Sequence, residues 1–170
     1  PASFHQDIVR SGIALFGGMH NTTDYGARPV VHLAARVIQI RDVLPNIGVG
    51  YGLDYKTPTA RRLATIGVGY ADGLPRQLGN VGAAWHYGCR LPIVGRVSMD
   101  SLTIDVSELP IDALREGEFV ELIGPSQSLC DIARDAATIS YEILTGLGSR
   151  HQRVYIEDGP TTIVAPEVQL

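Results

Sequence analysis

The sequence of 170 residues predicts a mainly-β fold, an antiparallel, Greek-key-like β-barrel with one late helix. Three observations lead to this fold class. About six short segments are rich in branched apolar residues, which favour strands. Turn signals such as Asp72-Gly73, Gly79-Asn80 and Gly124-Pro125 separate these segments. A single late segment has the spacing of an amphipathic helix. Short, regularly spaced strands of this kind are typical of barrels and sandwiches.

The expected strands follow one another along the chain as separate apolar runs. They cover residues 30–40 (VVHLAARVIQI), 63–68 (LATIGV), 90–99 (RLPIVGRVSM), 101–106 (SLTIDV), 118–124 (EFVELIG) and 153–157 (RVYIE). The expected helix is SLCDIARDAATISYEIL, residues 128–144, where Ser128 is a candidate N-cap with Asp131 three residues later. Its apolar stripe, which includes Leu129 and Ile132, predicts packing against the core.

The chain ends differ in character from its middle. Residues 7–18 (DIVRSGIALFGG) are expected to form an apolar strand that ends in glycines and is followed by a polar stretch. We therefore expect residues 1–20 to be the terminal segment of another domain, residues 21–158 to form the β-domain, and residues 159–170 to be a tail.

Composition narrows the classes of function. The net charge is −4, and the basic residues are scattered along the chain, which argues against a nucleic-acid or anionic-membrane surface. No apolar run approaches the ~20 residues of a membrane helix. Cys89 and Cys130 lack metal-ligand spacing, so free thiols and a cytoplasmic location are expected. Lys56 is the single lysine.

The string Gly-Val-Gly-Tyr occurs twice and ends at Tyr51 and at Tyr70. The residues that follow the two copies do not align, which argues against a structural repeat. Two interpretations remain open. In the first, both tyrosines cap the core at strand ends turned by glycine. In the second, the bent backbone holds both at one site.

Six strings occur in a characteristic order: VRSGIALFG, VGYGLDY, GVGYADG, IVGRVSMDS, ISYEI and SR…RVY. Together they resemble alanine racemase, a family of enzymes that use pyridoxal 5'-phosphate (PLP). The resemblance implies an N-terminal (β/α)8 barrel that holds PLP, a C-terminal mainly-β domain and a head-to-tail homodimer. Residues 1–20 would then be a remnant of the (β/α)8 barrel.

The resemblance also implies roles for residues of the β-domain. Tyr51 matches one of the two catalytic bases, since racemisation removes a proton from one face of Cα and delivers one to the other. Tyr70 matches the tyrosine that narrows the substrate entrance. Met99 and Asp100 match the substrate pocket, with Asp100 organising the loop. Without the resemblance, Met99-Asp100 would be read as a core residue followed by a turn.

Four further residues match positions that meet the cofactor. Arg10 corresponds to the arginine that hydrogen-bonds the pyridine nitrogen, and Gly12 and Ile13 to the segment that approaches PLP. Tyr141 corresponds to a hydroxyl donor to the phosphate; as an isolated signal it would be a tyrosine packed at a helix end. Lys56 does not match the family's PLP lysine, so the covalent lysine is expected outside this chain. No metal site is expected.

The resemblance implies that this chain is part of an enzyme that interconverts L-alanine and D-alanine, either for cell-wall synthesis or for catabolism. Tyr51, Tyr70, Met99 and Asp100 would act in trans, and the chain alone would be inactive. Apolar surface near Tyr51 should then be uncovered in this chain. Arg150 and Arg153 are expected to form structural ion pairs. Two alternatives remain: a racemase of another small amino acid such as serine, or a non-catalytic β-barrel interaction module.

Overall fold

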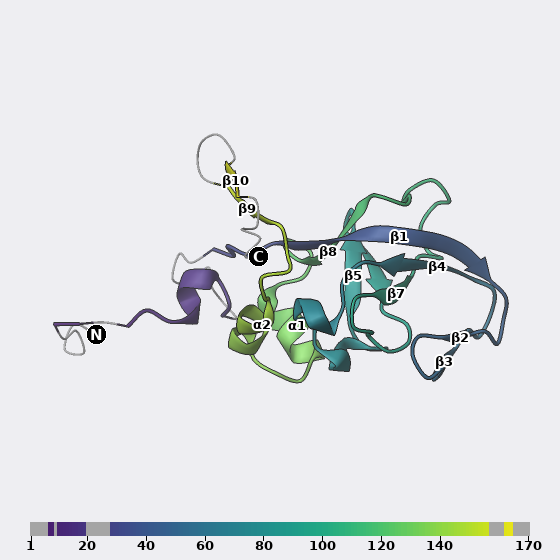
Figure 1. Ribbon diagram of the computed structural model, residues 1–170, viewed down its shortest axis with the longest axis horizontal. Helices are drawn as coiled ribbons and strands as arrows, with labels where there is room; N and C mark the ends of the chain where they lie inside the picture. Colours follow the sequence, from purple (N-terminus) through teal and green to yellow (C-terminus); the bar gives the residue numbers. More distant parts are fainter. Residues whose placement is uncertain (1–6, 9, 20–27, 157–161, 165–170) are drawn as a thin grey trace, which may run out of the picture.

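The computed structural model describes residues 7–8, 10–19, 28–156 and 162–164 (Figure 1). Six strands form one sheet, in which every hydrogen-bonded pair is antiparallel. The strands are β1 (Leu33–Val43), β4 (Arg61–Ile66), β5 (Ala83–His86), β6 (Cys89–Pro92), β7 (Leu102–Asp105) and β8 (Phe119–Ile123).

The sheet has the strand order β6-β5-β8-β1-β4-β7 and is nearly closed. Its two edge strands approach each other at a bridge between Ile93 and Ile104, and the N–H of Val94 donates to the Thr103 carbonyl at 2.9 Å. Because β8 lies beside β1, strands distant in sequence are neighbours in the sheet. This arrangement confirms the predicted antiparallel β-barrel.

Strand β1 is long, and different parts of it pair with two neighbouring strands. Its first part pairs with β8 and its second part with β4, and the register shifts between Leu33 and Ala34 and between Val37 and Gln39. An irregularity of this kind bends a strand and increases its twist. Over its first five residues, Leu33, Ala35 and Val37 are buried, and the residues between them are less buried. This alternation is expected for a strand with one face on the core.

The prediction of a single late helix over residues 128–144 is wrong in one respect, because two short helices occupy this segment. They are α1 (Leu129–Asp135) and α2 (Ser140–Gly146). The break falls at Ala137, which adopts a left-handed backbone conformation with φ of 55°. The expected capping box is present, with Ser128 accepting from the Asp131 N–H and the Asp131 carboxylate accepting from the Ser128 N–H.

The core fills the barrel and extends under α1 and α2. Side chains from the strands, such as Ile66, Leu91, Ile104 and Leu122, form one cluster with Ile132 of α1. A smaller cluster of Val49, Leu63 and Val94 lies beside it. The helical stripe therefore packs on the core, as the sequence predicts.

Short elements surround the barrel. Strands β2 (Gly48–Val49) and β3 (Tyr55–Lys56) form a hairpin at the end of the molecule opposite to α1 and α2 (Figure 1). Strand β9 (Arg153–Tyr155) pairs with β10 (Thr162–Val164), which lies in the segment expected to be a tail. Three of the short elements are 3₁₀ helices: η2 (Ile13–Phe16), η4 (Tyr70–Asp72) and η5 (Arg76–Leu78).

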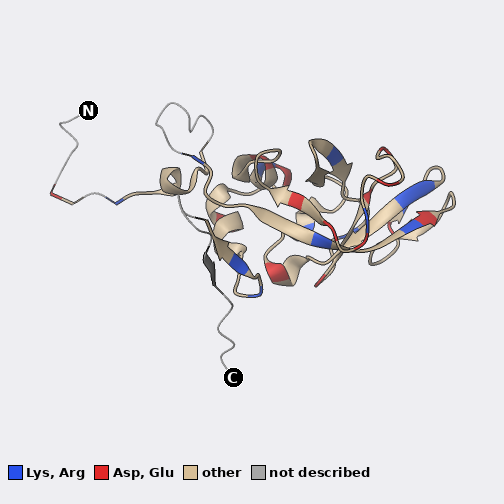
Figure 2. Cartoon of the chain, turned by 90° about the horizontal axis from the view of Figure 1, so that it is seen from above, with Lys and Arg blue, Asp and Glu red and all other residues tan. Residues whose placement is uncertain are grey.

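The predicted domain boundaries near residues 20 and 158 lie outside the described residues and stay predictions. Within residues 7–18, the structure has the 3₁₀ helix η2 where the sequence predicts a strand. Cys89 and Cys130 carry free thiols. Basic and acidic residues are interspersed along the chain (Figure 2). Among the described residues, no helix is both long and apolar enough to cross a bilayer.

Candidate functional site

Residues 95–99, after β6, form a segment that contacts both tyrosine-bearing turns. On one side, the turn before Tyr51 packs against Gly95 and Arg96. Gly50 has a φ of 75°, and a Cβ on it would lie 2.8 Å from the Arg96 nitrogen. Arg96 also forms an ion pair with Asp54, in the same turn as Tyr51. Glycine is therefore required here by both backbone conformation and space.

The turn of Tyr70 packs on the other end of the same segment. The N–H of Tyr70 donates to the Ser98 carbonyl at 3.0 Å, and the N–H of Ala71 donates to the Met99 carbonyl at 3.0 Å. A Cβ on Gly69 would lie only 2.3 Å from the Met99 carbonyl oxygen. The repeated Gly-Tyr pair is thus explained by two close backbone contacts with one segment, and not by a structural repeat.

Both tyrosine rings face outward from the core. Tyr51 lies in the turn between β2 and β3 with 77% of its surface exposed, and Tyr70 is 41% exposed. The guanidinium of Arg76 lies over the Tyr70 ring, 5.9 Å from its centroid. Tyr51 is too exposed to cap the core, whereas Tyr70 is partly covered. Both phenols are accessible on turns that contact the same segment.

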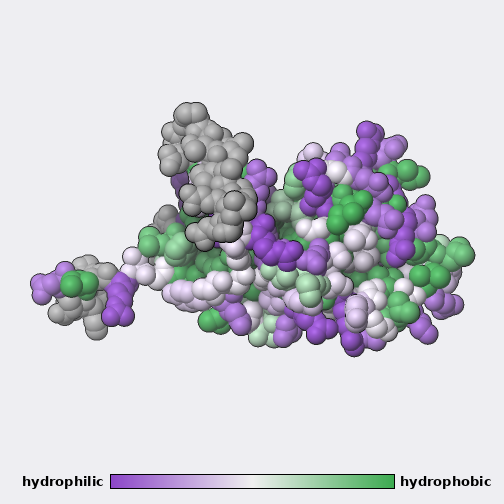
Figure 3. Space-filling view, viewed as in Figure 1, coloured by the Kyte–Doolittle hydropathy of each residue, from purple (hydrophilic) through white to green (hydrophobic). Residues whose placement is uncertain are grey.

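The surface around the hairpin is apolar, as expected for this chain. Leu44, Ile47 and Leu53 are 72%, 41% and 61% exposed. Figure 3 shows apolar surface at the end of the molecule that carries β2 and β3. An exposed apolar surface beside a polar aromatic tip is typical of an interaction site.

Met99 and Asp100 lie in the loop between β6 and β7, next to Tyr70. Met99 is 53% exposed, so it is not the core residue that the short motif alone suggests. The Asp100 carboxylate accepts a hydrogen bond from Arg150 at 2.6 Å. This contact and the attraction of Asp72 raise the pKa of Arg150, which stays charged. Arg150 is therefore an ion-pair partner, as expected, and the role of Asp100 in organising the loop stays a prediction.

Three of the four residues expected to meet the cofactor are brought together at the opposite end. The Tyr141 hydroxyl accepts a hydrogen bond from the Ile13 N–H at 2.8 Å. A Cβ on Gly12 would lie 2.8 Å from the same hydroxyl oxygen. The thiol of Cys130 donates to the Gly18 carbonyl at 3.2 Å, which holds the end of this segment on α1.

Arg10, the fourth of these residues, is exposed at the start of the same segment. The N-terminal segment lies beside α2 (Figure 1), and the β2–β3 hairpin lies at the far end of the barrel. Arg10 and Tyr141 are thus separated from Tyr51 by the length of the domain. One chain presents two half-sites and does not bring all the predicted residues to one place.

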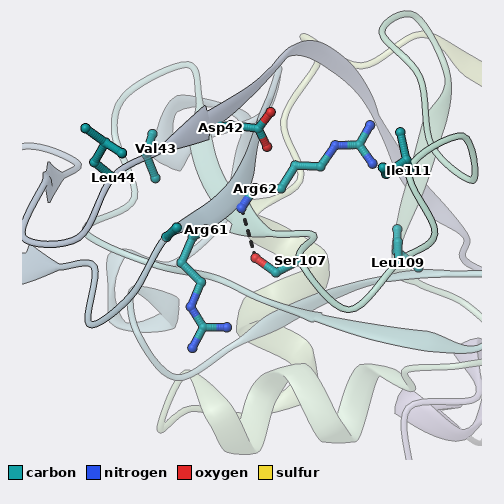
Figure 4. A pocket seen from close by; sticks show the side chains of 9 residues that line it. Asp42, Val43, Leu44, Arg61, Arg62, Ser107, Leu109 and Ile111 are labelled. Carbon is teal, nitrogen blue, oxygen red and sulfur yellow. Dashed lines mark hydrogen bonds between the residues drawn. The ribbon is translucent and has the colours of Figure 1, made fainter.

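Two surface pockets differ in their relation to these residues. The first, about 430 Å³, is lined by residues from the ends of β1 and β4 and the loop after β7, and includes no predicted site residue. There the N–H of Arg62 donates to Ser107 (Figure 4). The second, about 390 Å³, is lined by Tyr70, Arg76 and the hinge between α1 and α2. Neither contains a group of metal-ligating side chains among the described residues.

The fold and the two half-sites define a class: a β-barrel domain with accessible tyrosines on glycine-turned loops at one end and a hydroxyl-to-backbone contact at the other. A family model described as the C-terminal domain of alanine racemase matches residues 30–155. The chain belongs to this family.

Relatives and solved structures agree with that family. A catabolic alanine racemase of Agrobacterium fabrum is 52% identical over 163 residues, which are 95% of this chain and 42% of the relative. An alanine racemase of Brucella ovis is 51% identical over 168 residues, 91% of this chain and 42% of the relative. The chain therefore spans about two fifths of the length of these relatives.

Two solved structures show the same architecture. The alanine racemase of Bartonella henselae, with covalently bound pyridoxal phosphate, has a TM-score of 0.79 and 44% identity, covering 85% of this chain and 40% of that one. The alanine racemase of Streptomyces coelicolor has a TM-score of 0.83 and 35% identity, covering 89% and 41%.

Asp72 and Arg96 support the site but were not singled out from the sequence. Asp72 reads as the start of a turn, and Arg96 lies inside an expected strand. Their contacts with Arg150 and Asp54 join residues far apart in the chain, so no local signal indicates them. The predominance of arginine, with Lys56 the single lysine, is the one hint in the sequence, because arginine favours forked ion pairs.

Proposed function

We propose that this chain is the C-terminal part of an alanine racemase, an isomerase that interconverts L-alanine and D-alanine with PLP. The observation that carries the proposal is the exposed Tyr51 phenol, held on a glycine-turned hairpin in a chain of this family. The non-catalytic interaction module is not favoured, because the matched relatives are named as racemases.

The residues at the α2 end fit the phosphate of PLP. Gly12 leaves the space beside the Tyr141 hydroxyl free of a Cβ. That hydroxyl accepts from Ile13 and still has its own proton to donate to an anionic oxygen. Arg10 is the proposed partner of the pyridine nitrogen. When bound, PLP would supply the electron withdrawal that makes the Cα proton of alanine acidic. The covalent lysine would come from outside this chain.

Tyr51 would then hold or remove a proton at one face of Cα. A base on the other face is needed for inversion, and it too would come from outside this chain. The Tyr70 turn packs against residues 95–99, the segment that ends at Met99 and also contacts the Tyr51 hairpin. Tyr70 and Met99 would limit the size of the substrate, with Asp100 holding the Met99 loop in place.

The separation of the two half-sites supports a shared active site. Tyr51 lies at the end of the domain opposite to Tyr141 (Figure 1), so both would serve one active site only if they come from different chains. A homodimer would bring the hairpin of one chain to the cofactor of the other. The apolar side chains around the hairpin, Leu44 and Leu53, are exposed in this chain and would be covered in the homodimer.

The experiment uses the full-length protein that contains this chain, loaded with PLP. L-alanine should yield D-alanine, and D-alanine should yield L-alanine. The Tyr51→Phe variant should lower kcat by about 10²- to 10⁴-fold, the usual contribution of an acid–base group. Tyr55→Phe is the matched control, since Tyr55 packs against the small core cluster in the same hairpin.

A second measurement separates Tyr51 from a structural role. In D₂O, Tyr51→Phe should still exchange the Cα proton of one enantiomer without inverting it, because the base on the other face remains. Full racemisation by Tyr51→Phe would contradict the assignment of Tyr51. Turnover of serine above that of alanine would favour the alternative substrate.

The metabolic setting follows from the reaction. A racemase of this kind would supply D-alanine for cell-wall synthesis or consume it in catabolism, and we propose a cytoplasmic location. The Agrobacterium fabrum relative is named as catabolic. Growth of a deletion strain with and without added D-alanine would distinguish the two roles.

A further inference from the structure

Two loops that carry proposed substrate residues are joined by one guanidinium group. Arg150 follows α2, and its Nη2 donates to the Asp100 carboxylate at 2.6 Å. Its Nε lies 3.3 Å from the other partner, the Asp72 carboxylate. Asp72 ends the Tyr70 turn and Asp100 directly follows Met99. The fork of Arg150 therefore spans the two loops.

Asp72 transmits this contact to the backbone of its loop. One of its oxygens faces Arg150, and the other accepts from the Gly69 N–H at 2.8 Å. The carbonyl of Asp72 accepts from Nε2 of His151 at 2.6 Å. The Asp72 side chain is only 13% exposed, so its charge is better shielded from water than that of Arg150 or Asp100.

The Tyr70 and Met99 loops also contact each other directly. Tyr70 and Ala71 donate to the carbonyls of Ser98 and Met99. These two backbone bonds fix the loops at one point, and Arg150 fixes them at a second. Two points of attachment restrict rotation of one loop against the other, which one point does not.

We propose that Arg150 is a positioning residue that sets the distance between Tyr70 and Met99 and so the fit of the substrate. The inference deepens the proposed function and rests on it, but the loop geometry can be measured separately. A planar fork with donors in two directions suits this role. A lysine ammonium is a compact charge on a flexible stem and lacks the planar fork that fixes both directions.

The chain offers a matched control in α1. Arg134 is also an exposed arginine that contacts two carboxylates, those of Asp131 and Asp135. Both of these partners belong to its own helix. Arg134→Gln therefore removes the same chemical group and the same number of carboxylate partners without touching either substrate loop.

The test compares Arg150→Gln, Arg150→Lys and Arg134→Gln in the full-length protein with PLP. Arg150→Gln should raise amide hydrogen exchange in residues 69–73 and 98–101 together. It should raise KM for alanine about tenfold, with a smaller change in kcat, because misplaced binding loops weaken substrate positioning. The KM of Arg150→Lys should lie between those of Arg150→Gln and the parent protein. Arg134→Gln should leave exchange in both loops and KM unchanged.

Three results would overturn the inference. Two of them are unchanged exchange in both loops of Arg150→Gln and a fall in kcat with KM unchanged. Exchange that rises equally across the whole domain would also overturn it, since that would show a general loss of stability. If the parent protein does not racemise alanine, the proposed function fails. The exchange experiment still decides whether Arg150 holds the two loops.

Discussion

The Tyr141 hydroxyl accepts the Ile13 N–H at 2.8 Å, although 128 residues separate the two in sequence. This bond attaches the N-terminal segment to α2. Together with the contact of Cys130 with Gly18, it places Gly12 and Ile13 on the helices of the β-domain. A hydroxyl that accepts from the backbone keeps its own proton free, which is what an anion requires of it.

Tyr141→Phe should weaken PLP binding in the full-length protein. Hydrogen bonds to charged groups contribute about 1.5–3 kcal/mol, so the expected loss of affinity is about tenfold or more. Equilibrium dialysis with PLP measures this effect. Tyr87→Phe is the control, because Tyr87 is 96% exposed in the turn between β5 and β6. Equal affinity of Tyr141→Phe and the parent protein would contradict the assignment of Tyr141 to the phosphate.

Gly69→Ala should destabilise the domain and displace the Tyr70 turn. The new Cβ would lie 2.3 Å from two backbone carbonyl oxygens, which cannot move as a flexible side chain can. Overpacking of this kind costs about 1–3 kcal/mol. Urea denaturation measures the cost. Gly148→Ala is the control, since its Cβ would meet nothing within 4 Å. Equal stability of the two variants would show that the loops can separate freely.

The barrel could be predicted from the sequence where branched apolar residues dominate. Strands β7 and β8 fall within expected segments. Strands β1 and β4 overlap theirs, with β1 continuing to Val43 and β4 beginning at Arg61. Strand β5 was missed because its residues, Ala-Ala-Trp-His, include no branched side chain. The division of the late helix was missed because Ala137 is a strong helix former, and only tertiary packing places it in a left-handed conformation.

The site was predictable as a set of residues but not as an arrangement. The order of the motifs indicates Tyr51, Tyr70 and Tyr141. It does not show that Tyr51 lies on a hairpin at one end of the barrel and Tyr141 on a helix at the other. That separation depends on strand pairing across the sheet. The bond between Arg150 and Asp100, 50 residues apart, depends on it in the same way.

Cys130 should react with thiol reagents much more slowly than Cys89. Cys130 is buried and donates to the Gly18 carbonyl, whereas Cys89 is half-buried. Cys130→Ala should leave that carbonyl with one donor fewer and raise hydrogen exchange in residues 12–18. Hydrogen exchange at the exposed residues of α1 should not change. Rapid modification of Cys130 in the folded protein would show that the N-terminal segment does not stay on α1.

Asp131 should make the domain sensitive to acid. The hydrogen bond from the Ser128 side chain is the main cause that lowers the pKa of Asp131 below its ordinary value; burial opposes it, and the Ser128 N–H and Arg134 assist it. Because the folded-state pKa is the lower one, the stabilisation is complete above the unfolded-state pKa, near 4. It is lost as the pH falls through the folded-state pKa.

Asp131→Asn should therefore lower the free energy of unfolding by about 0.5–1 kcal/mol at pH 7, since the variant loses a charge at a helix N-terminus. Urea denaturation from pH 7 to pH 2 should show the difference between parent and variant shrinking below pH 4. Ser128→Ala should flatten the same part of the curve, because it removes the main donor to the carboxylate. A difference that stays constant down to the lowest pH would mean that the charge of Asp131 does not stabilise α1.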